Sequence, residues 1–224
     1  MEKNNPLYKN QGAHVISVLF TVDKGITKVL LIRRKMEPYK DMWALVSGAL
    51  YNNENLEVGL RRELKEKTGI EGIDLMLSNV FGDVNRSNLM RMIGISYIGI
   101  IDSGKIKALK STLKTTDSDW FSINDVPLLA YDHNEILKDA LETLKKKIVS
   151  TNILKSFFPN GFTLPELQKV YEAIMNKTLD RRNFRKKILN LGFIYDTSDY
   201  VKFEGNKPAK LYKFKDVYED KNIF

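Results

Sequence analysis

Glutamates at helical spacing follow a glycine in the first third of the chain, a pattern that can bind a divalent metal. Glu63 and Glu66 lie one helical turn apart in LRRELKEKTGI (60–70), and Glu54 precedes them. Residues three or four apart share one face of a helix, and carboxylate oxygens are the ligands that Mg²⁺ prefers. Magnesium would neutralise phosphates and activate water there. The chemistry that this spacing indicates is hydrolysis of a diphosphate.

Lys67 lies in the same helix and argues against that chemistry. It follows Glu66 directly and stands four residues after Glu63, so its ammonium group competes with a metal for both carboxylates. At ~4 Å, a unit charge repels each unit of cation charge by ~4 kcal/mol when the effective dielectric constant is about 20. We therefore expect no metal site. If one exists, Glu63 and Glu66 are its ligands, and magnesium is a cofactor only of a residual hydrolase activity.

The same residues also have a purely structural interpretation. Arg62 with Glu66, and Glu63 with Lys67, are opposite charges at positions i and i+4, and each such pair stabilises a helix by ~0.2–0.5 kcal/mol. We predict that no residue here is catalytic and that a former active site survives as an ion-paired scaffold. Its members are Gly48, Glu54, Arg62, Glu63, Glu66 and Lys67.

The elements around this helix predict an α+β domain with a mixed β-sheet. Apolar runs at 13–22 and 28–33, separated by a turn, are typical of a β-hairpin. Gly69 is expected to end the first helix, and Asp132 is expected to be the N-cap of a second. His133, next in the chain, is expected to be structural. Further strands are expected at 43–50, 75–82, 92–101 and around Trp120, and helices at 55–68 and 132–149.

The pattern changes near Ser150, and the residues after it predict a winged helix-turn-helix. Thr163 to Glu166 read as a capping box that begins a helix. A second helix follows Asp180, and short strands then surround a turn at 204–208. Two helices joined by a short turn and followed by a basic hairpin are the layout of a winged helix. We therefore expect one domain at 1–150 and a second at 151–224.

The second of these helices carries a basic outer face. RRNFRKK (181–187) contains five cations, whereas Phe184, Ile188 and Leu191 recur at helical spacing and should point inward. Lys and Arg can contact phosphates, and Arg and Asn can read guanine and adenine. A basic helix can also be only a solvated face, or bind protein, but this order of elements favours double-stranded DNA. The candidate DNA contacts are Thr163, Arg181, Arg182, Asn183, Arg185, Lys186, Lys207 and Lys210.

Composition agrees with a DNA-binding protein of the cytoplasm. The 224 residues include no cysteine and carry a net charge of +8. Without cysteine there are no disulfides or thiolate metal sites. The apolar runs are too short to span a membrane, and MEKNNPLYKN (1–10) lacks an apolar signal core, so neither secretion nor a membrane partner is expected. Residues 150–224 hold 14 Lys and Arg against 9 Asp and Glu, so much of the positive excess lies in the expected DNA-binding domain.

The residues from Gly48 to Ile70 fit the spacing of the Nudix signature, G-x5-E-x7-R-E-U-x-E-E-x-G-U, except at Lys67. The residues before the loop also differ, since Val46-Ser47-Gly48 stands where the family has Pro-Gly-Gly. The first domain therefore resembles a Nudix domain. Its combination with a winged helix resembles the Nudix-related transcriptional regulators, on segments such as DWFSINDVPLLAYDHNEIL (119–137) and FTLPELQKVYEAIMNKTLDRRNFRKKILNLGFI (162–194).

This resemblance implies a Nudix-type sheet between helices and a homodimer paired through its Nudix domains. Members include repressors of NAD biosynthesis that respond to ADP-ribose and relatives that control pentose catabolism. A small effector, either ADP-ribose or a pentose sugar or sugar phosphate, would loosen the winged helices from an operator. The candidate effector-binding residues are Arg34, Trp43, Phe81, Arg86 and Arg91.

The candidate effector-binding residues do not decide which small molecule is the effector. The arginines suit a phosphate, and the aromatic residues could stack on a ring or fill the core, core being the more usual role in strands. Where members that respond to ADP-ribose carry R-D-P-R-like residues, this chain reads NRSNLMR (85–91). The sequence favours a DNA-binding regulator, expected to be a repressor, with a Nudix domain as its sensor. The alternative is a Mg-dependent Nudix hydrolase of ADP-ribose or a related nucleoside diphosphate derivative.

Overall fold

The computed structural model describes residues 11–88, 90–104, 109, 111–202 and 208–216. Its centre is a seven-stranded mixed sheet in the order β3-β2-β1-β6-β5, with β4 paired to β1 and β7 paired to β2. The β1–β6 pair is parallel and the other pairs of this sheet are antiparallel. The strands are β1 (Gln11–Asp23), β2 (Ile26–Arg34), β3 (Trp43–Ala44), β4 (Val46–Ala49), β5 (Met76–Phe81), β6 (Arg91–Ile100) and β7 (Thr115–Ser122).

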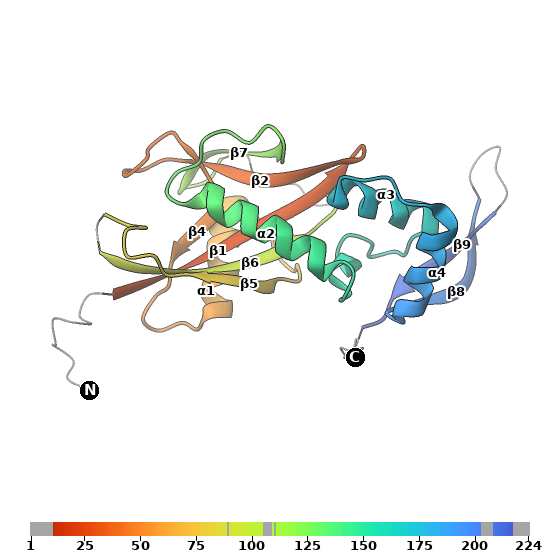
Figure 1. Cartoon of the computed structure of the whole chain (residues 1–224). Coiled ribbons are helices and arrows are strands. Elements are labelled where there is room, and N and C mark those ends of the chain that lie inside the picture. Colours follow the sequence, from red (N-terminus) through yellow and green to blue (C-terminus); the bar gives the residue numbers. More distant parts are fainter. Residues whose placement is uncertain (1–10, 89, 105–108, 110, 203–207, 217–224) are drawn as a thin grey trace.

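Two helices enclose this sheet, one on each face (Figure 1). Leu64 of the first helix packs in a cluster with Leu19, whereas Ile136 of the second packs in a cluster with Val18. Val18 and Leu19 are adjacent on β1, and successive side chains of a strand point to opposite faces. The predicted mixed sheet between helices is therefore confirmed. The helices are α1 (Leu56–Thr68) and α2 (His133–Lys147).

Local signals set both ends of α1, and the one at Gly69 was predicted. The Asn55 side chain accepts a hydrogen bond from the backbone N–H of Val58 at 3.0 Å, which caps the start of the helix. Gly69 takes the left-handed conformation, with φ 72°, at its end. The helix therefore begins immediately after the loop that carries Glu54.

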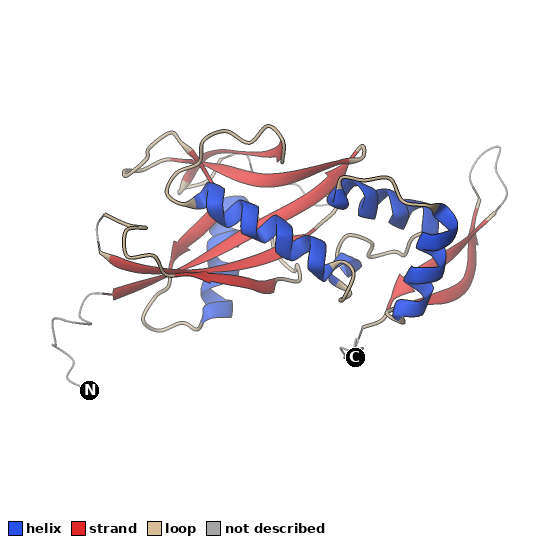
Figure 2. Cartoon of the chain, viewed as in Figure 1, coloured by secondary structure: helices blue, strands red, loops and turns tan. Residues whose placement is uncertain are grey.

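The C-terminal part is the predicted winged helix-turn-helix (Figure 2). Thr163 and Glu166 form the capping box at the start of α3, and the Asp180 side chain caps α4 by accepting from the Asn183 N–H at 2.8 Å. No helix in the described part of the chain is long and apolar enough to cross a membrane. The elements are η1 (Ile153–Lys155), α3 (Leu164–Met175), α4 (Arg181–Leu191), β8 (Ile194–Val201) and β9 (Ala209–Phe214).

The sheet and the winged helix share one hydrophobic core. A single cluster of buried residues extends from Val18 in β1, through Leu144 of α2, to Tyr171 of α3. The Tyr171 hydroxyl donates a hydrogen bond to the carbonyl of Ile148, just beyond α2. Figure 1 shows α2 crossing the sheet and ending beside α3. Most apolar residues of the segment that connects the two predicted domains are buried: Ile148, Ile153, Leu154, Phe157 and Phe162.

Candidate functional site

The carboxylates of α1 are bound by cations of the chain itself. Lys67 Nζ lies 3.1 Å from Glu63 Oε2, and Lys67 also donates to the carbonyl of Ser47. Arg62 lies 2.5 Å from a carboxylate oxygen of Glu54 and 2.5 Å from one of Glu63. The Glu63 side chain is only 5% exposed and that of Lys67 13%. The predicted Glu63–Lys67 pair is therefore a buried contact, not a surface one.

Glu66 completes this network with one predicted and one unpredicted partner. Arg62 Nη1 lies 3.6 Å from Glu66 Oε2, so the predicted i,i+4 pair is present. Lys114, immediately before β7, donates to Glu66 and lies 3.6 Å from Glu63 Oε1. Lys114 is 48 residues from Glu66 in the chain, and no local pattern indicates that the two meet.

The absence of a side chain at Gly48 leaves space for the carboxyl group of the buried Glu63. A Cβ atom at position 48 would overlap the Glu63 carboxyl group, so any larger residue would have to displace this carboxylate from its present position. Gly48 pairs with Val15 in the β1–β4 ladder, which fixes the loop against the sheet. The glycine of the signature is thus required by packing whether or not the site binds a metal.

Neighbouring cations lower the pKa of two carboxyl groups of this network, Glu54 and Glu63. The hydrogen-bonded Arg62 guanidinium lowers the pKa of Glu54 to about 2. Burial acts to raise the pKa of Glu63, but Lys67 and Arg62 outweigh it, and the pKa is lowered. Burial lowers the pKa of Lys67 against the attraction of Glu63.

The residues of this network do not fit a magnesium site. A divalent ion would need the oxygens of Glu63 and Glu66, which Lys67, Arg62 and Lys114 already engage, and it would lie against three positive charges. Among the residues that the structure describes, no group of three or more His, Asp or Glu is suited to hold a metal.

A second polar cluster lines a pocket of about 440 Å³ at the start of α2. Arg86 binds Asp132 at two points, with Nε–Oδ2 2.9 Å and Nη2–Oδ1 3.1 Å. The rings of Tyr39 and Tyr131 meet edge to face with centroids 4.7 Å apart. The Arg34 guanidinium lies 4.9 Å from the centroid of the Tyr131 ring. The pocket thus combines aromatic surface with guanidinium groups, which suits a ligand that carries a phosphate and a ring.

The predicted effector residues do not all meet at this pocket. Arg86 lines it, and Arg34 contacts Tyr131 in its wall. Arg91 instead donates to the carbonyls of Gly82 and Asp83 at 2.6 and 2.9 Å, so it braces the loop before β6. Trp43 and Phe81 both pack against the main core, Trp43 on Phe121 with centroids 4.7 Å apart. For these two aromatic residues the structure shows the core role.

Asp132 is the N-cap residue of α2, as predicted, but its side chain makes no capping hydrogen bond. The Arg86 guanidinium donates two charge-assisted hydrogen bonds, one to each carboxylate oxygen of Asp132. A helix cap would give this carboxylate only a hydrogen bond from a neutral backbone N–H, which is weaker. His133 is structural as expected. Its Nδ1 accepts from the Leu45 N–H at 3.0 Å, and burial lowers its pKa to about 3.

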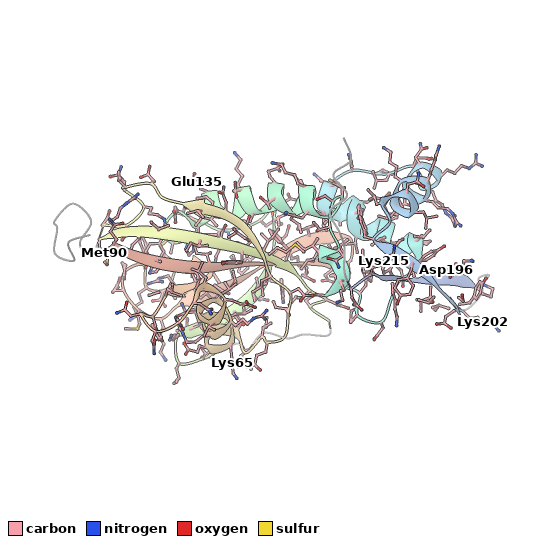
Figure 3. The ribbon with its side chains drawn as sticks, turned by 90° about the horizontal axis from the view of Figure 1, so that it is seen from below. Lys65, Met90, Glu135, Asp196, Lys202 and Lys215 are labelled. Carbon is pink, nitrogen blue, oxygen red and sulfur yellow. The ribbon has the colours of Figure 1, made fainter. Side chains whose placement is uncertain are left out.

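The outer face of α4 presents cations to solvent. Phe184 and Ile188 are buried, as predicted. Figure 3 shows long side chains extending from α4 at one end of the molecule, whereas Met90 and Glu135 lie toward the other. The exposed cations of this face are Arg181, Arg182, Arg185 and Lys186.

The remaining candidate DNA contacts have mixed outcomes. Asn183 lies on the flank of α4, lining a groove of about 540 Å³ beside α3. Lys210 is half-exposed and pairs with Asp196 across the hairpin at 2.6 Å. Lys207 lies outside the described residues. Thr163 was wrongly predicted as a DNA contact, because its side chain is buried and its hydroxyl bonds Glu166 within the capping box.

Comparison with known proteins gives matches over both domains. The NUDIX domain model matches residues 11–144, and the model of the NrtR DNA-binding winged helix domain matches residues 154–214. The chain is 33% identical over 201 residues to the ADPR responsive transcriptional repressor NtrR of Acinetobacter baylyi, a match that covers 88% of this chain and 79% of the relative.

Two solved structures of Shewanella oneidensis NrtR are also similar. NrtR complexed with a 27mer DNA superposes with a TM-score of 0.77 at 27% identity, over 91% of this chain and 93% of that one. Its NUDIX domain complexed with ADP ribose superposes with a TM-score of 0.57 at 27% identity, over 62% of this chain and 93% of that one.

Proposed function

The chain belongs to the NrtR family of Nudix and winged-helix proteins, and from this premise we propose that it is a transcriptional repressor released from its operator by ADP-ribose. The observation that carries the proposal is the exposed basic face of α4 within a winged helix that shares its core with a Nudix domain. Arg182 and Arg185 meet base edges or phosphates in the major groove. We propose that it acts in the cytoplasm, on DNA there.

The repressor acts as a homodimer paired through its Nudix domains. Each chain contributes one recognition helix, α4. Helix-turn-helix dimers bind two half-sites about one helical turn apart, so two copies of α4 match a two-fold symmetric operator. An effector that changes the geometry of the pair moves the two helices out of register with the half-sites.

ADP-ribose binds in the pocket lined by Arg86, Tyr39 and Tyr131. The diphosphate meets the Arg86 guanidinium, and an adenine or ribose ring packs on the tyrosine pair. Arg34, over the Tyr131 ring, adds positive charge nearby. A free pentose has no phosphate for these arginines, which favours ADP-ribose over a simple sugar.

The Nudix domain is a sensor and not an enzyme. Hydrolysis needs a metal held by the carboxylates of α1, and Lys67 and Lys114 neutralise Glu63 and Glu66. The protein therefore requires no cofactor. The hydrolase alternative would need Lys67 to leave the buried contact that it makes with Glu63.

A fluorescence anisotropy titration of the full chain on DNA from upstream of its own gene tests this proposal. It is run over a range of salt concentrations, with and without ADP-ribose and with L-arabinose as the pentose control. We expect tight, salt-dependent binding that ADP-ribose weakens and arabinose leaves unchanged. Specific binding that no ligand weakens would overturn the sensor role, and absence of DNA binding would overturn the whole proposal.

A further inference from the structure

The ion pair between Arg86 and Asp132 occupies the wall of the proposed effector pocket. The Arg86 side chain is only 5% exposed, and both of its bonds to Asp132 are of ordinary length, 2.9 and 3.1 Å. This two-point arrangement of a carboxylate on a guanidinium is also the one that a phosphate group adopts. Asp132 thus fills the position that an anionic ligand would need.

The pocket around this pair leaves space on the ligand side. About 440 Å³ lies between the ion pair, the two tyrosines and the loop at 85–88. Arg34 cannot easily replace Arg86 as the anion partner, because its Nε donates to the Pro38 carbonyl at 2.9 Å and its guanidinium lies over Tyr131. Arg86 is therefore the cation for which Asp132 and a phosphate compete.

Asp132 also connects the pocket to the DNA-binding domain. It stands at the start of α2 without capping the helix. The buried face of α2 runs along the sheet through Ile136 and Leu144 into the core that contains α3. At the far end, the Ile148 carbonyl accepts a hydrogen bond from Tyr171 of α3. A displacement at Asp132 is thus applied to a helix whose other end touches the helix-turn-helix (Figure 1).

We propose that Asp132 is a built-in competitor of the effector: it occupies Arg86 in the free protein, and a diphosphate ligand displaces it. Displacement releases the start of α2 from the loop that carries Arg86, and α2 transmits the change to α3. The inference rests on the proposed function for the identity of the ligand, but the competition itself requires only an anion of the phosphate class.

The test compares Asp132→Asn with Glu135→Gln in the full chain. Asp132→Asn keeps the size of the side chain and removes the charge that competes for Arg86. Glu135→Gln removes the same charge from the first turn of the same helix, at an exposed residue that Figure 3 shows pointing away from the body of the molecule. It therefore controls for the effect of charge on the helix dipole.

Isothermal titration calorimetry measures ADP-ribose and inorganic pyrophosphate binding, and anisotropy measures DNA binding without ligand. We expect Asp132→Asn to bind both anions at least about fivefold more tightly, the lower end of typical coupling between sites. It should also bind DNA more weakly than wild type, since it imitates the displaced state. Glu135→Gln should match wild type in all three titrations.

The outcomes separate this inference from the proposed function. Wild-type protein that binds no ADP-ribose would overturn the proposed ligand, while a gain in pyrophosphate affinity in Asp132→Asn would still support the competition. A folded Asp132→Asn protein with no gain for either anion would overturn the inference. If that variant does not fold, Asp132→Ser replaces it, because serine also removes the charge that competes for Arg86. It should bind both anions more tightly than wild type, and unchanged affinity would overturn the inference.

Discussion

Replacement of Lys67 by methionine should destabilise the protein, because Lys67 is one of the cations paired with the buried carboxylate of Glu63. Its Nζ lies 3.1 Å from Glu63 Oε2, and the Glu63 side chain is 5% exposed. Removing one partner of a buried ion pair costs ~3–5 kcal/mol. Arg62 and Lys114 still face Glu63 in the variant, so we expect a smaller loss of about 2–3 kcal/mol.

The assay is thermal unfolding followed by circular dichroism. For a chain of this size, 1 kcal/mol moves the Tm by about 2–4 °C, so Lys67→Met should lower it by about 4–12 °C. Lys65→Met is the matched control on the same helix. Lys65 pairs with Glu71 in solvent, with 66% and 55% of the two side chains exposed. Exposed pairs of this kind contribute little to stability, so the Tm of Lys65→Met should stay close to that of wild type.

A double variant separates loss of the charge pair from loss of the lysine stem. Glu63→Gln combined with Lys67→Met leaves no uncompensated negative charge, so it should recover part of the Tm that Lys67→Met loses. A Lys67→Met protein as stable as Lys65→Met would show that Lys67 does not form a stabilising buried pair with Glu63 in solution.

Three further predictions concern the winged helix and the loss of stability at acid pH. Arg185→Glu should abolish specific operator binding in an anisotropy titration while leaving the Tm unchanged; full binding would show that α4 is not the recognition helix. Thr163→Ala removes the capping box of α3 and should lower the free energy of unfolding by about 1 kcal/mol in a urea titration, and an unchanged midpoint would contradict the cap. Glu54 has a pKa lowered from 4.5 to about 2, so its contribution to stability is present above pH 4.5 and is lost as the pH falls through about 2. The Tm difference between wild type and Glu54→Gln should therefore shrink over that range, and a difference that grows would have the wrong sign.

The features that the sequence predicted correctly depend on residues close together in the chain. Gly69 marks the end of α1, and Thr163 with Glu166 marks the start of α3, because the groups that satisfy a helix end lie within four residues of it. The inward stripe of α4 follows from helical spacing in the same way.

The features that the sequence did not predict depend on contacts between distant segments. Lys114 reaches Glu66 because β7 pairs with β2 and brings the preceding loop to α1. Tyr39, Arg86 and Asp132 come from three separate loops that meet only in the folded sheet. Asp132 carries a correct local signal for a cap, but a stronger charged partner 46 residues away overrides it. The shared core of the two domains could not be predicted from the sequence for the same reason. An apolar stripe shows that one face of an element is buried, but it does not identify the element that packs against that face.

The most direct test of the central claim measures DNA release and ADP-ribose turnover in the same tubes. Full-length protein, its upstream DNA, ADP-ribose and Mg²⁺ are incubated together, anisotropy reports the bound DNA, and chromatography reports AMP and ribose 5-phosphate. We expect DNA to be released while ADP-ribose remains intact. Formation of AMP and ribose 5-phosphate without specific DNA binding would contradict this expectation, and would show that a protein with Lys67 in this helix is still an enzyme.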